Sequence, residues 1–191
     1  MVDALLPDEL SAAHGYYASS KLLNVCVQGW FDEFSDSQKV RKFFDEEMLP
    51  LVNCLDGAIA KHTVEVGGTV FSGHGNSIGC IGSLRGEPNS FVGLRYRYPG
   101  YISASEDIWV ANKFLCNNLS KSDCPVRLEI ELIPGQKVLP LTTATGQGAE
   151  MEFLLPRGSE FTITSAAMTA VEGVGNPVLN LKLRPPVFVK G

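Results

Sequence analysis

The spacing of apolar residues changes once along the chain, at Gly67 and Gly68. Before these glycines apolar residues recur at helical spacing, and after them they occur in short runs between glycine-rich turns. A spacing of three and four residues places side chains on one face of a helix, whereas strict alternation places them on one face of a strand. We therefore expect one α+β domain over 1–191, with a helical N-terminal part (1–66) and a β-rich core (67–191).

The clearest helical pattern is an apolar stripe at i, i+3, i+4, i+7 and i+8. Its members are Leu51, Cys54, Leu55, Ala58 and Ile59. Weaker signals predict an earlier helix containing Leu22, Leu23, Cys26 and Val27, and a turn within the polar stretch 32–39. They also predict a later helix that Ser105 caps, with Glu106 and Asp107 in its first turn and Ile108, Ala111 and Leu115 on its buried face.

The clearest strand is 126–132, where apolar and polar residues alternate strictly. A turn is expected at 156–159, where the order Pro-Arg-Gly-Ser separates two apolar runs. The strands expected besides 126–132 are 69–71, 91–94, 100–104, 152–155, 161–164 and 178–183.

Composition narrows the classes of function. The chain is 45% hydrophobic and 19% charged, which is typical of a globular domain with a real core. Its net charge of −5 lacks the basic footprint of a dedicated nucleic-acid binder. The five cysteines form no C-x-x-C pair, so we expect reduced thiols, no disulfide framework and no metal site. No apolar run approaches the length of a membrane span.

Two glutamates, Glu150 and Glu152, lie at the start of a predicted strand. Side chains at i and i+2 point to the same face of a strand. Like charges this close raise each other's pKa, which makes the charged pair unfavourable by itself. A site that stabilises a cation would use such a pair. An isolated acidic pair is most often an exposed strand end, so the surrounding sequence has to decide between the two interpretations.

That surrounding sequence, "EMEFLLPRGSEF", is similar to the Glu-x-Glu block of the arginine-type mono-ADP-ribosyltransferases. Residues 100–105, followed by Ala111 and Phe114, resemble the family's Ser-Thr-Ser block, with Ala104 in the middle position. The segments "YYASSKLLNVCVQG" and "LPLVNCLDGAIAKH" look like its first helices. The resemblance covers residues 10–164 approximately, and the bacterial binary-toxin and phage transferases are the most similar by pattern.

The resemblance implies two packed, mostly antiparallel β-sheets with NAD⁺ in the cleft between them. It implies that Glu152 stabilises an oxocarbenium-like ribose, that Glu150 orients or deprotonates the acceptor, and that Ser103 holds Glu152 by a hydrogen bond. The residues that it implies for NAD⁺ binding are Ser72, Gly73, His74, Ser103, Ser105, Phe114 and Glu152, and those for the acceptor are Thr145, Gln147 and Glu150.

The implied activity is transfer of ADP-ribose from NAD⁺ to a macromolecule, with release of nicotinamide. The expected acceptor is a protein arginine, and the expected role is that of a bacterial or phage toxin or effector. Such a protein acts in the cytoplasm of a target cell after secretion or injection as part of a larger protein, with a host target or an immunity protein as partner and no membrane partner. The alternatives are a catalytically impaired binding module, an NAD⁺ glycohydrolase, and a transferase acting on nucleic acid.

The chain departs from the family where "GGTVFSGHG" aligns with the strand that carries the NAD-binding arginine. Ser72 stands in the place of that arginine, and serine cannot supply a fork of charge-assisted donors. Three explanations are left open. His74 takes over, as a histidine does in the diphtheria-toxin branch; Arg85, Arg95 or Arg97 reaches in; or the chain binds NAD⁺ poorly.

Overall fold

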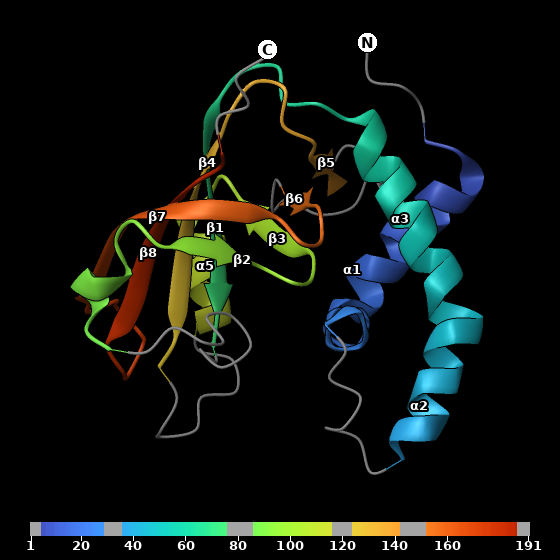
Figure 1. Cartoon of the computed structure of the whole chain (residues 1–191), viewed down its shortest axis with the longest axis horizontal. Helices are drawn as coiled ribbons and strands as arrows, with labels where there is room; N and C mark the ends of the chain where they lie inside the picture. The colour runs from blue at the N-terminus through green and yellow to red at the C-terminus, as the bar shows by residue number, and fades with distance from the viewer. Residues whose placement is uncertain (1–4, 29–35, 76–85, 116–123, 142–151, 187–191) are drawn as a thin grey trace.

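The computed structural model describes residues 5–28, 36–75, 86–115, 124–141 and 152–186. Helices come first and strands dominate from residue 68 onward, which confirms the α+β class (Figure 1). None of the helices in these ranges has the length and apolarity needed to cross a membrane. The elements in chain order are α1 (Pro7–Val27), α2 (Ser37–Phe43), η2 (Phe44–Met48), α3 (Leu49–Lys61), β1 (Gly68–His74), η3 (Pro88–Phe91), β2 (Arg95–Arg97), β3 (Ile102–Ser105), α5 (Ile108–Leu115), β4 (Val126–Leu132), β5 (Leu139–Pro140), β6 (Glu152–Leu155), β7 (Glu160–Thr169) and β8 (Val178–Arg184).

The elements α2, η2 and α3 follow one another without a break, and η2 is a π-helical turn between the two α-helices. Asp36 caps α2, because its side chain accepts the N–H of Lys39 at 3.0 Å. The polar stretch 32–39 was predicted to hold a turn, and Asp36 is a turn residue directly before α2 begins at Ser37. Residues 32–35 lie outside the described ranges.

The buried stripe of α3 packs against α1 and against the edge of the sheet formed by β5 and β6. Leu55, Ala58 and Ile59 are at most 2% exposed, as the apolar spacing predicts. Leu51 and Cys54 are only half-buried, so they flank the stripe. The cluster that joins α1, α3 and β6 consists of Ala12, Ala13, Tyr16, Leu23, Met48, Val52, Leu55, Ala58, Ile59, Tyr101, Leu139, Leu141 and Leu154.

The eight strands follow the hydrogen-bonded order β2-β7-β8-β4-β1-β3-β6-β5. All neighbouring pairs are antiparallel except β4 and β8. Strands β1 and β3 meet in a single pair, Phe71 with Ser105. The strands therefore form two groups, one of five and one of three strands, which this narrow bridge joins into one continuous sheet.

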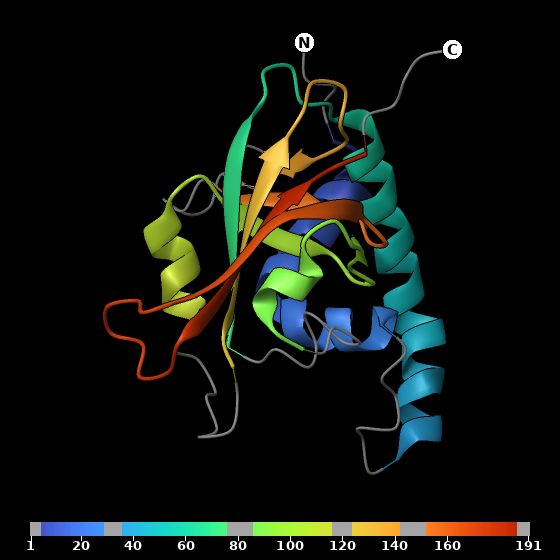
Figure 2. The same cartoon turned by 60° about the vertical axis from the view of Figure 1, so that its left-hand side comes forward.

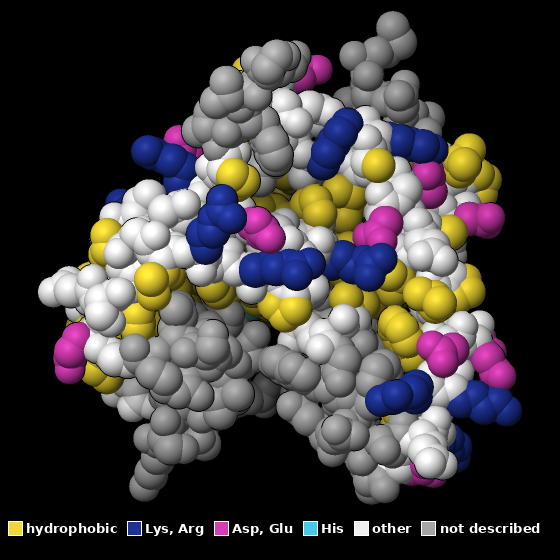
Figure 3. Space-filling model, viewed as in Figure 1, with side chains coloured by type: hydrophobic (Ala, Val, Ile, Leu, Met, Phe, Trp, Pro, Cys, Tyr) yellow, Lys and Arg dark blue, Asp and Glu magenta, His cyan; other side chains and the backbone are white. Residues whose placement is uncertain are grey.

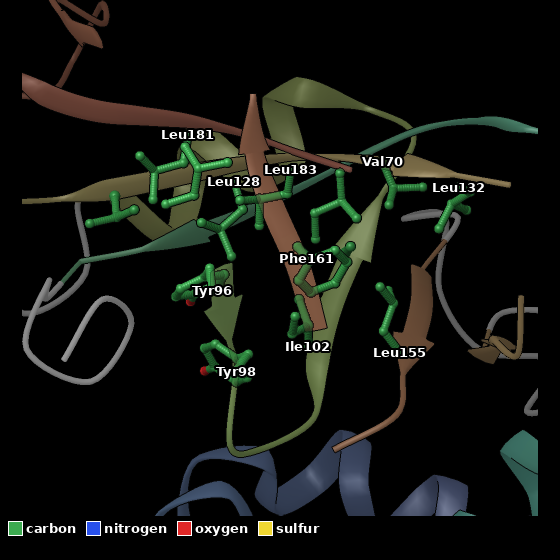
Figure 4. Close-up of a cluster of buried hydrophobic side chains, with 14 of the residues drawn as sticks. Val70, Tyr96, Tyr98, Ile102, Leu128, Leu132, Leu155, Phe161, Leu181 and Leu183 are labelled. Atoms are coloured by element: carbon green, nitrogen blue, oxygen red, sulfur yellow. The ribbon is translucent and has the colours of Figure 1, made fainter. Parts of the chain in front are cut away.

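The two groups of strands share a hydrophobic core (Figure 4). Val70, Leu128 and Leu181 come from the five-strand group, and they face Ile102 and Leu155 of the three-strand group. The predicted packing of two layers is thus present, although the layers also share hydrogen bonds at their junction. Alternation decides which side chains enter this core: in β4, every second residue from Val126 to Leu132 is buried.

The strand predicted over 91–94 is wrong. Residues Pro88–Phe91 form a 3-10 helix, and Phe91 is buried as a single apolar anchor. Pro88 at its first turn favours the helical φ, and Gly93 follows with a φ of 89°, which a strand does not allow. Apolar content alone therefore misled the prediction here, because the flanking proline and glycine determine the local backbone.

Helix α5 lies on the opposite side of β1 from α1 and α3 (Figures 1 and 2). It begins at Ile108, later than predicted, because Asp107 accepts the N–H of Trp109 at 2.8 Å. The hydroxyl of Ser105 accepts the N–H of Asp107 at 3.1 Å, so Ser105 supports the approach to the helix from the end of β3. Ala111 and Leu115 are buried as predicted.

Candidate active site

The candidate site begins with Glu152 at the start of β6. In the antiparallel pair of β3 and β6, Ser105 lies opposite Glu152 and Ser103 lies opposite Leu154. Ser103 is therefore the diagonal neighbour of Glu152 on the same face, within reach of its side chain. The hydroxyl of Ser103 donates a hydrogen bond to Oε1 of Glu152, as the resemblance implied. The two strands thus hold the carboxylate in one orientation.

A buried tyrosine of α1 lies close to this carboxylate. Tyr16 is 1% exposed, and Nδ2 of Asn24 donates a hydrogen bond to its phenol oxygen at 3.2 Å. Burial raises the pKa of Tyr16, and the negative charge of Glu152 raises this pKa further. Tyr16 is therefore a neutral phenol beside an anionic carboxylate, and it connects the site to the helical layer.

Ser72 lies at the junction of the two groups of strands. Its hydroxyl donates to the backbone oxygen of Ser103 at 2.6 Å and lies 3.1 Å from Nε2 of His74. Because β1 and β3 are joined by only one residue pair, this side chain supplies a further link between them. Ser72 is 4% exposed, so its hydroxyl has little access to solvent.

The hydrogen bonds of Ser72 define the proton position on His74. Ser72 has one proton and gives it to Ser103, so its oxygen accepts from Nε2–H of His74. Burial lowers the pKa of His74 to about 4, so the ring is neutral at pH 7. Its Nδ1 is then a bare acceptor, and the imidazole packs beside Tyr98 with ring centroids 5.6 Å apart.

Gly73 faces helix α5. A Cβ atom added at this position would lie 1.9 Å from the backbone oxygen of Ala111, so only glycine permits this approach. Phe114 lies one turn after Ala111 and is 45% exposed. The structure therefore gives Gly73 a packing role and leaves the ring of Phe114 accessible; their contacts with NAD⁺ remain predictions.

Three other residues predicted for the site cannot be placed beside it. Thr145, Gln147 and Glu150 lie outside the described residues. Ser105 is placed, but it is 1% exposed and its hydroxyl accepts from the backbone of Asp107, which directs it toward α5.

Of the arginines considered as substitutes at position 72, the two that the structure describes face outward. Arg85 is outside the described ranges. Arg95 and Arg97 are exposed and alternate with buried Tyr96 along β2, so they point away from the core. In Figure 3, Lys and Arg side chains extend across this outer face, from β2 toward the turn that follows β6. Tyr98, which contacts His74, is buried on the other side.

Sequence reasoning did not include the residues that support the site from the helical layer. Asn24 accepts the N–H of Tyr101 at 2.9 Å, and its amide also donates to Tyr16. The Tyr101 and Tyr16 rings pack edge to face with centroids 5.8 Å apart. The tyrosine and asparagine of the first helix were a detectable signal, because both belong to the segment that resembles the family. Nothing local to Tyr101 indicates that it meets α1.

A comparison with protein-family models identifies the family. The model described as ADP-ribosyltransferase exoenzyme matches residues 35–184, and the chain therefore belongs to this family. Its members are ADP-ribosyltransferases, which use NAD⁺ as substrate. No curated protein matches the chain by sequence.

Solved structures show the same fold. Plx2a, an ADP-ribosyltransferase toxin from Paenibacillus larvae, superposes with a TM-score of 0.67 at 18% identity, over 96% of this chain and 88% of that one. C3stau2 from S. aureus, solved with NAD, gives 0.60 at 15% identity, over 95% and 88%. The ADP-ribosyltransferase Vis in complex with agmatine gives 0.65 at 16% identity, over 97% and 77%.

Proposed function

We propose that this chain is a mono-ADP-ribosyltransferase that modifies an arginine of a target protein, with Glu152 as its catalytic carboxylate. The observation that carries the proposal is the hydrogen bond from Ser103 to Glu152 across β3 and β6. Family membership supplies the reaction and its substrate NAD⁺. The hydrogen bond supports the choice of carboxylate, because a group that stabilises a cation must be held in place before charge develops.

In the proposed reaction, the bond between C1′ of the ribose and the nicotinamide nitrogen breaks. The bonding electron pair leaves with nicotinamide, which becomes neutral, and positive charge develops on the ribose. Glu152 stabilises that charge. Opposite charges about 4 Å apart at an effective dielectric constant near 20 interact by about 4 kcal/mol. Interaction of that size, if present only in the transition state, corresponds to roughly a thousandfold in rate.

A guanidinium group is the proposed acceptor. Its nitrogen forms the new bond to C1′ and loses a proton, for which Glu150 is the proposed base. The similar structure of Vis contains agmatine, a small molecule that carries a guanidinium group. We infer that Thr145 and Gln147 contact the acceptor, and that the chain acts as a toxin or effector on a protein of a target cell.

Recognition of NAD⁺ in this proposal uses neutral groups at the position of the usual arginine. Nδ1 of His74 can accept a hydrogen bond from a hydroxyl or amide of the substrate. The geometry favours His74 over Arg95 and Arg97, because both arginines project from the outer face of β2.

Replacing Glu152 by glutamine tests the catalytic assignment. We expect kcat for nicotinamide release to fall by about a thousandfold, because glutamine keeps the shape but loses the charge. The matched control is Glu172→Gln, which neutralises an exposed carboxylate in the turn between β7 and β8 and should leave kcat unchanged. Equal turnover by wild type and Glu152→Gln would reject the assignment.

The acceptor is tested with agmatine and with protein from a cell lysate. Transfer to a guanidinium predicts an agmatine product heavier by one ADP-ribose unit, and label on lysate protein that agmatine competes away. Nicotinamide release without any labelled acceptor would indicate a glycohydrolase. Label that nuclease removes would indicate a nucleic-acid acceptor.

One observation favours a second candidate, a module of this fold that no longer catalyses. Ser72 is already bonded to Ser103, and neutral His74 supplies no charge for a pyrophosphate. This alternative predicts no nicotinamide release by the wild type at millimolar NAD⁺, whereas the favoured proposal predicts turnover that depends on Glu152.

A further inference from the structure

A three-residue polar network lies at the opposite end of the β3–β6 ladder from Glu152. The phenol of Tyr101 donates to Oδ1 of Asp56 at 2.7 Å. Nε and Nη2 of Arg157 donate to Oδ2 of the same carboxylate at 2.9 and 2.7 Å. Asp56 lies on α3, so one helical carboxylate accepts from two separate segments of the β-rich part, one through each oxygen.

These two segments are the ends of adjacent strands. Tyr101 directly precedes β3, and Arg157 lies in the turn that follows β6. Ile102 and Leu155 form the last pair of the ladder before Tyr101 and that turn. Asp56 therefore holds the beginning of the strand that carries Ser103 and the end of the strand that carries Glu152.

The network is also connected to the remainder of the site. The backbone N–H of Tyr101 is bound by Asn24, and its ring packs on Tyr16, the buried neighbour of Glu152. The hydrogen bond to Asp56 raises the pKa of Arg157, while burial and the Asp56 carboxylate raise that of Tyr101. Arg157 therefore stays charged and Tyr101 stays neutral at neutral pH, so the Tyr101 phenol is the donor to Asp56.

We propose that Asp56 is a positioning residue: together with Arg157 and Tyr101 it sets β3 against β6 and so aligns Ser103 with Glu152. This inference rests on the proposed role of Glu152. An ordinary ion pair between half-exposed side chains contributes little to stability. The effect expected here is on geometry, because displacement of a reacting group by about 1 Å can lower a rate by up to a hundredfold.

The test compares Asp56→Asn and Arg157→Ala with Arg184→Ala. Asparagine preserves the size of Asp56 and can still accept from Tyr101, but it loses the charge that holds Arg157. Arg184 forms an ion pair of the same length, 2.7 Å, with Glu131 between β8 and β4, at similar exposure. Its removal controls for the loss of one arginine pair elsewhere in the sheet.

We expect kcat for nicotinamide release to fall about tenfold in Asp56→Asn and in Arg157→Ala, with KM for NAD⁺ within about twofold of wild type. The double variant should lose no more than either single variant, because both remove one interaction. Arg184→Ala should keep the wild-type kcat. A fall no greater than in this control, or a change confined to KM, overturns the inference.

Absence of turnover in the wild type would contradict the proposed function and not the positioning role. A crystal structure of Asp56→Asn tests the positioning role in either case. We expect the Ser103–Glu152 hydrogen bond to be lost or lengthened in the variant. A variant that retains this bond with unchanged pairing of β3 and β6 overturns the inference whatever its activity.

Discussion

At the scale of single residues, the site relies on hydroxyl and imidazole groups where the family pattern has a guanidinium. Ser72 donates to Ser103 and accepts from His74, so both hydrogen-bonding functions of its hydroxyl are used. Ser103 in turn orients Glu152 with its own hydroxyl. The carboxylate is thus supported by a short series of neutral groups. Because these groups are neutral, none of them can compensate for a positive charge on His74.

Protonation of His74 should destabilise the folded chain. Its pKa is about 4 in the folded chain and 6.5 ordinarily, so the unfolded chain binds this proton first as pH falls. His74 should therefore lower stability progressively from pH 6.5 to about pH 4, by at most about 3 kcal/mol, since one pKa unit corresponds to about 1.4 kcal/mol. Denaturant unfolding across this range should show a shallower pH slope in His74→Asn. An identical slope in both proteins would contradict this origin of the acid sensitivity.

Residue-scale contacts could be predicted from sequence only where they lie within a recognisable segment. The pairing of Ser103 with Glu152 was predictable because each belongs to a motif with its own local spacing. The contact between Asp56 and Arg157 joins residues 101 positions apart. Each lies in a segment that resembles the family, but neither segment indicates that the two side chains meet. The contact arises from the way α3 packs against the strand ends, which depends on the tertiary fold.

At the scale of elements, the position of α5 depends on the absence of a side chain in β1. The helix backbone at Ala111 approaches Gly73 so closely that a methyl group would overlap its carbonyl oxygen. On the same strand, a Cβ added at Gly68 would have no atom within 4 Å. Two glycines of one strand therefore have different roles, although the sequence alone does not distinguish them.

Replacing Gly73 by alanine should displace α5 or β1 and destabilise the protein by about 1–3 kcal/mol, the usual cost of overpacking. Because β1 also carries Ser72 and His74, nicotinamide release should fall in the same variant. Gly68→Ala is the matched control, and its free energy of unfolding should lie within about 0.5 kcal/mol of the wild-type value. Denaturant unfolding measures both. Equal stability of the two variants would show that α5 does not need the close approach.

At the scale of the whole molecule, the fold class followed from the change in apolar spacing, because alternation and helical periodicity each report one buried face. The spacing of apolar residues could not indicate how the layers are connected. The two strand groups meet at one residue pair, Phe71 with Ser105, and the helical layer joins the sheet through residues such as Leu154. These connections depend on which buried faces meet in three dimensions.

One ion pair connects Glu9 of α1 to Lys61 of α3, two residues that are 52 positions apart in the chain. Nζ of Lys61 lies 2.7 Å from Oε2 of Glu9, whose side chain is only 8% exposed. The N–H of Leu6 donates to the same oxygen at 2.7 Å. Burial alone would raise the pKa of Glu9, but the hydrogen bonds from Lys61 and Leu6 and the nearby positive charges outweigh it, and the pKa is lowered.

Replacing Lys61 by methionine leaves the buried Glu9 carboxylate without its positively charged partner. We expect the free energy of unfolding to fall by about 2 kcal/mol at pH 7. In the wild type, the stability that Glu9 contributes is fully present above its ordinary pKa of 4.5 and is lost as pH falls through its lowered folded value. In Lys61→Met the folded pKa of Glu9 is higher than in the wild type because burial is less opposed, so less stability should be lost as pH falls and the gap to the wild type should narrow in acid. Adding Glu9→Gln should recover part of the stability, because it removes the uncompensated charge.

The matched control is Lys182→Met, which breaks a 2.9 Å pair with Glu129 on the exposed face of the sheet and should cost less than about 1 kcal/mol. Denaturant unfolding from pH 3 to 7 measures these three variants and the wild type. If Lys61→Met costs no more than Lys182→Met, or if Glu9→Gln lowers its stability further, the pair does not hold the helical layer together in this way.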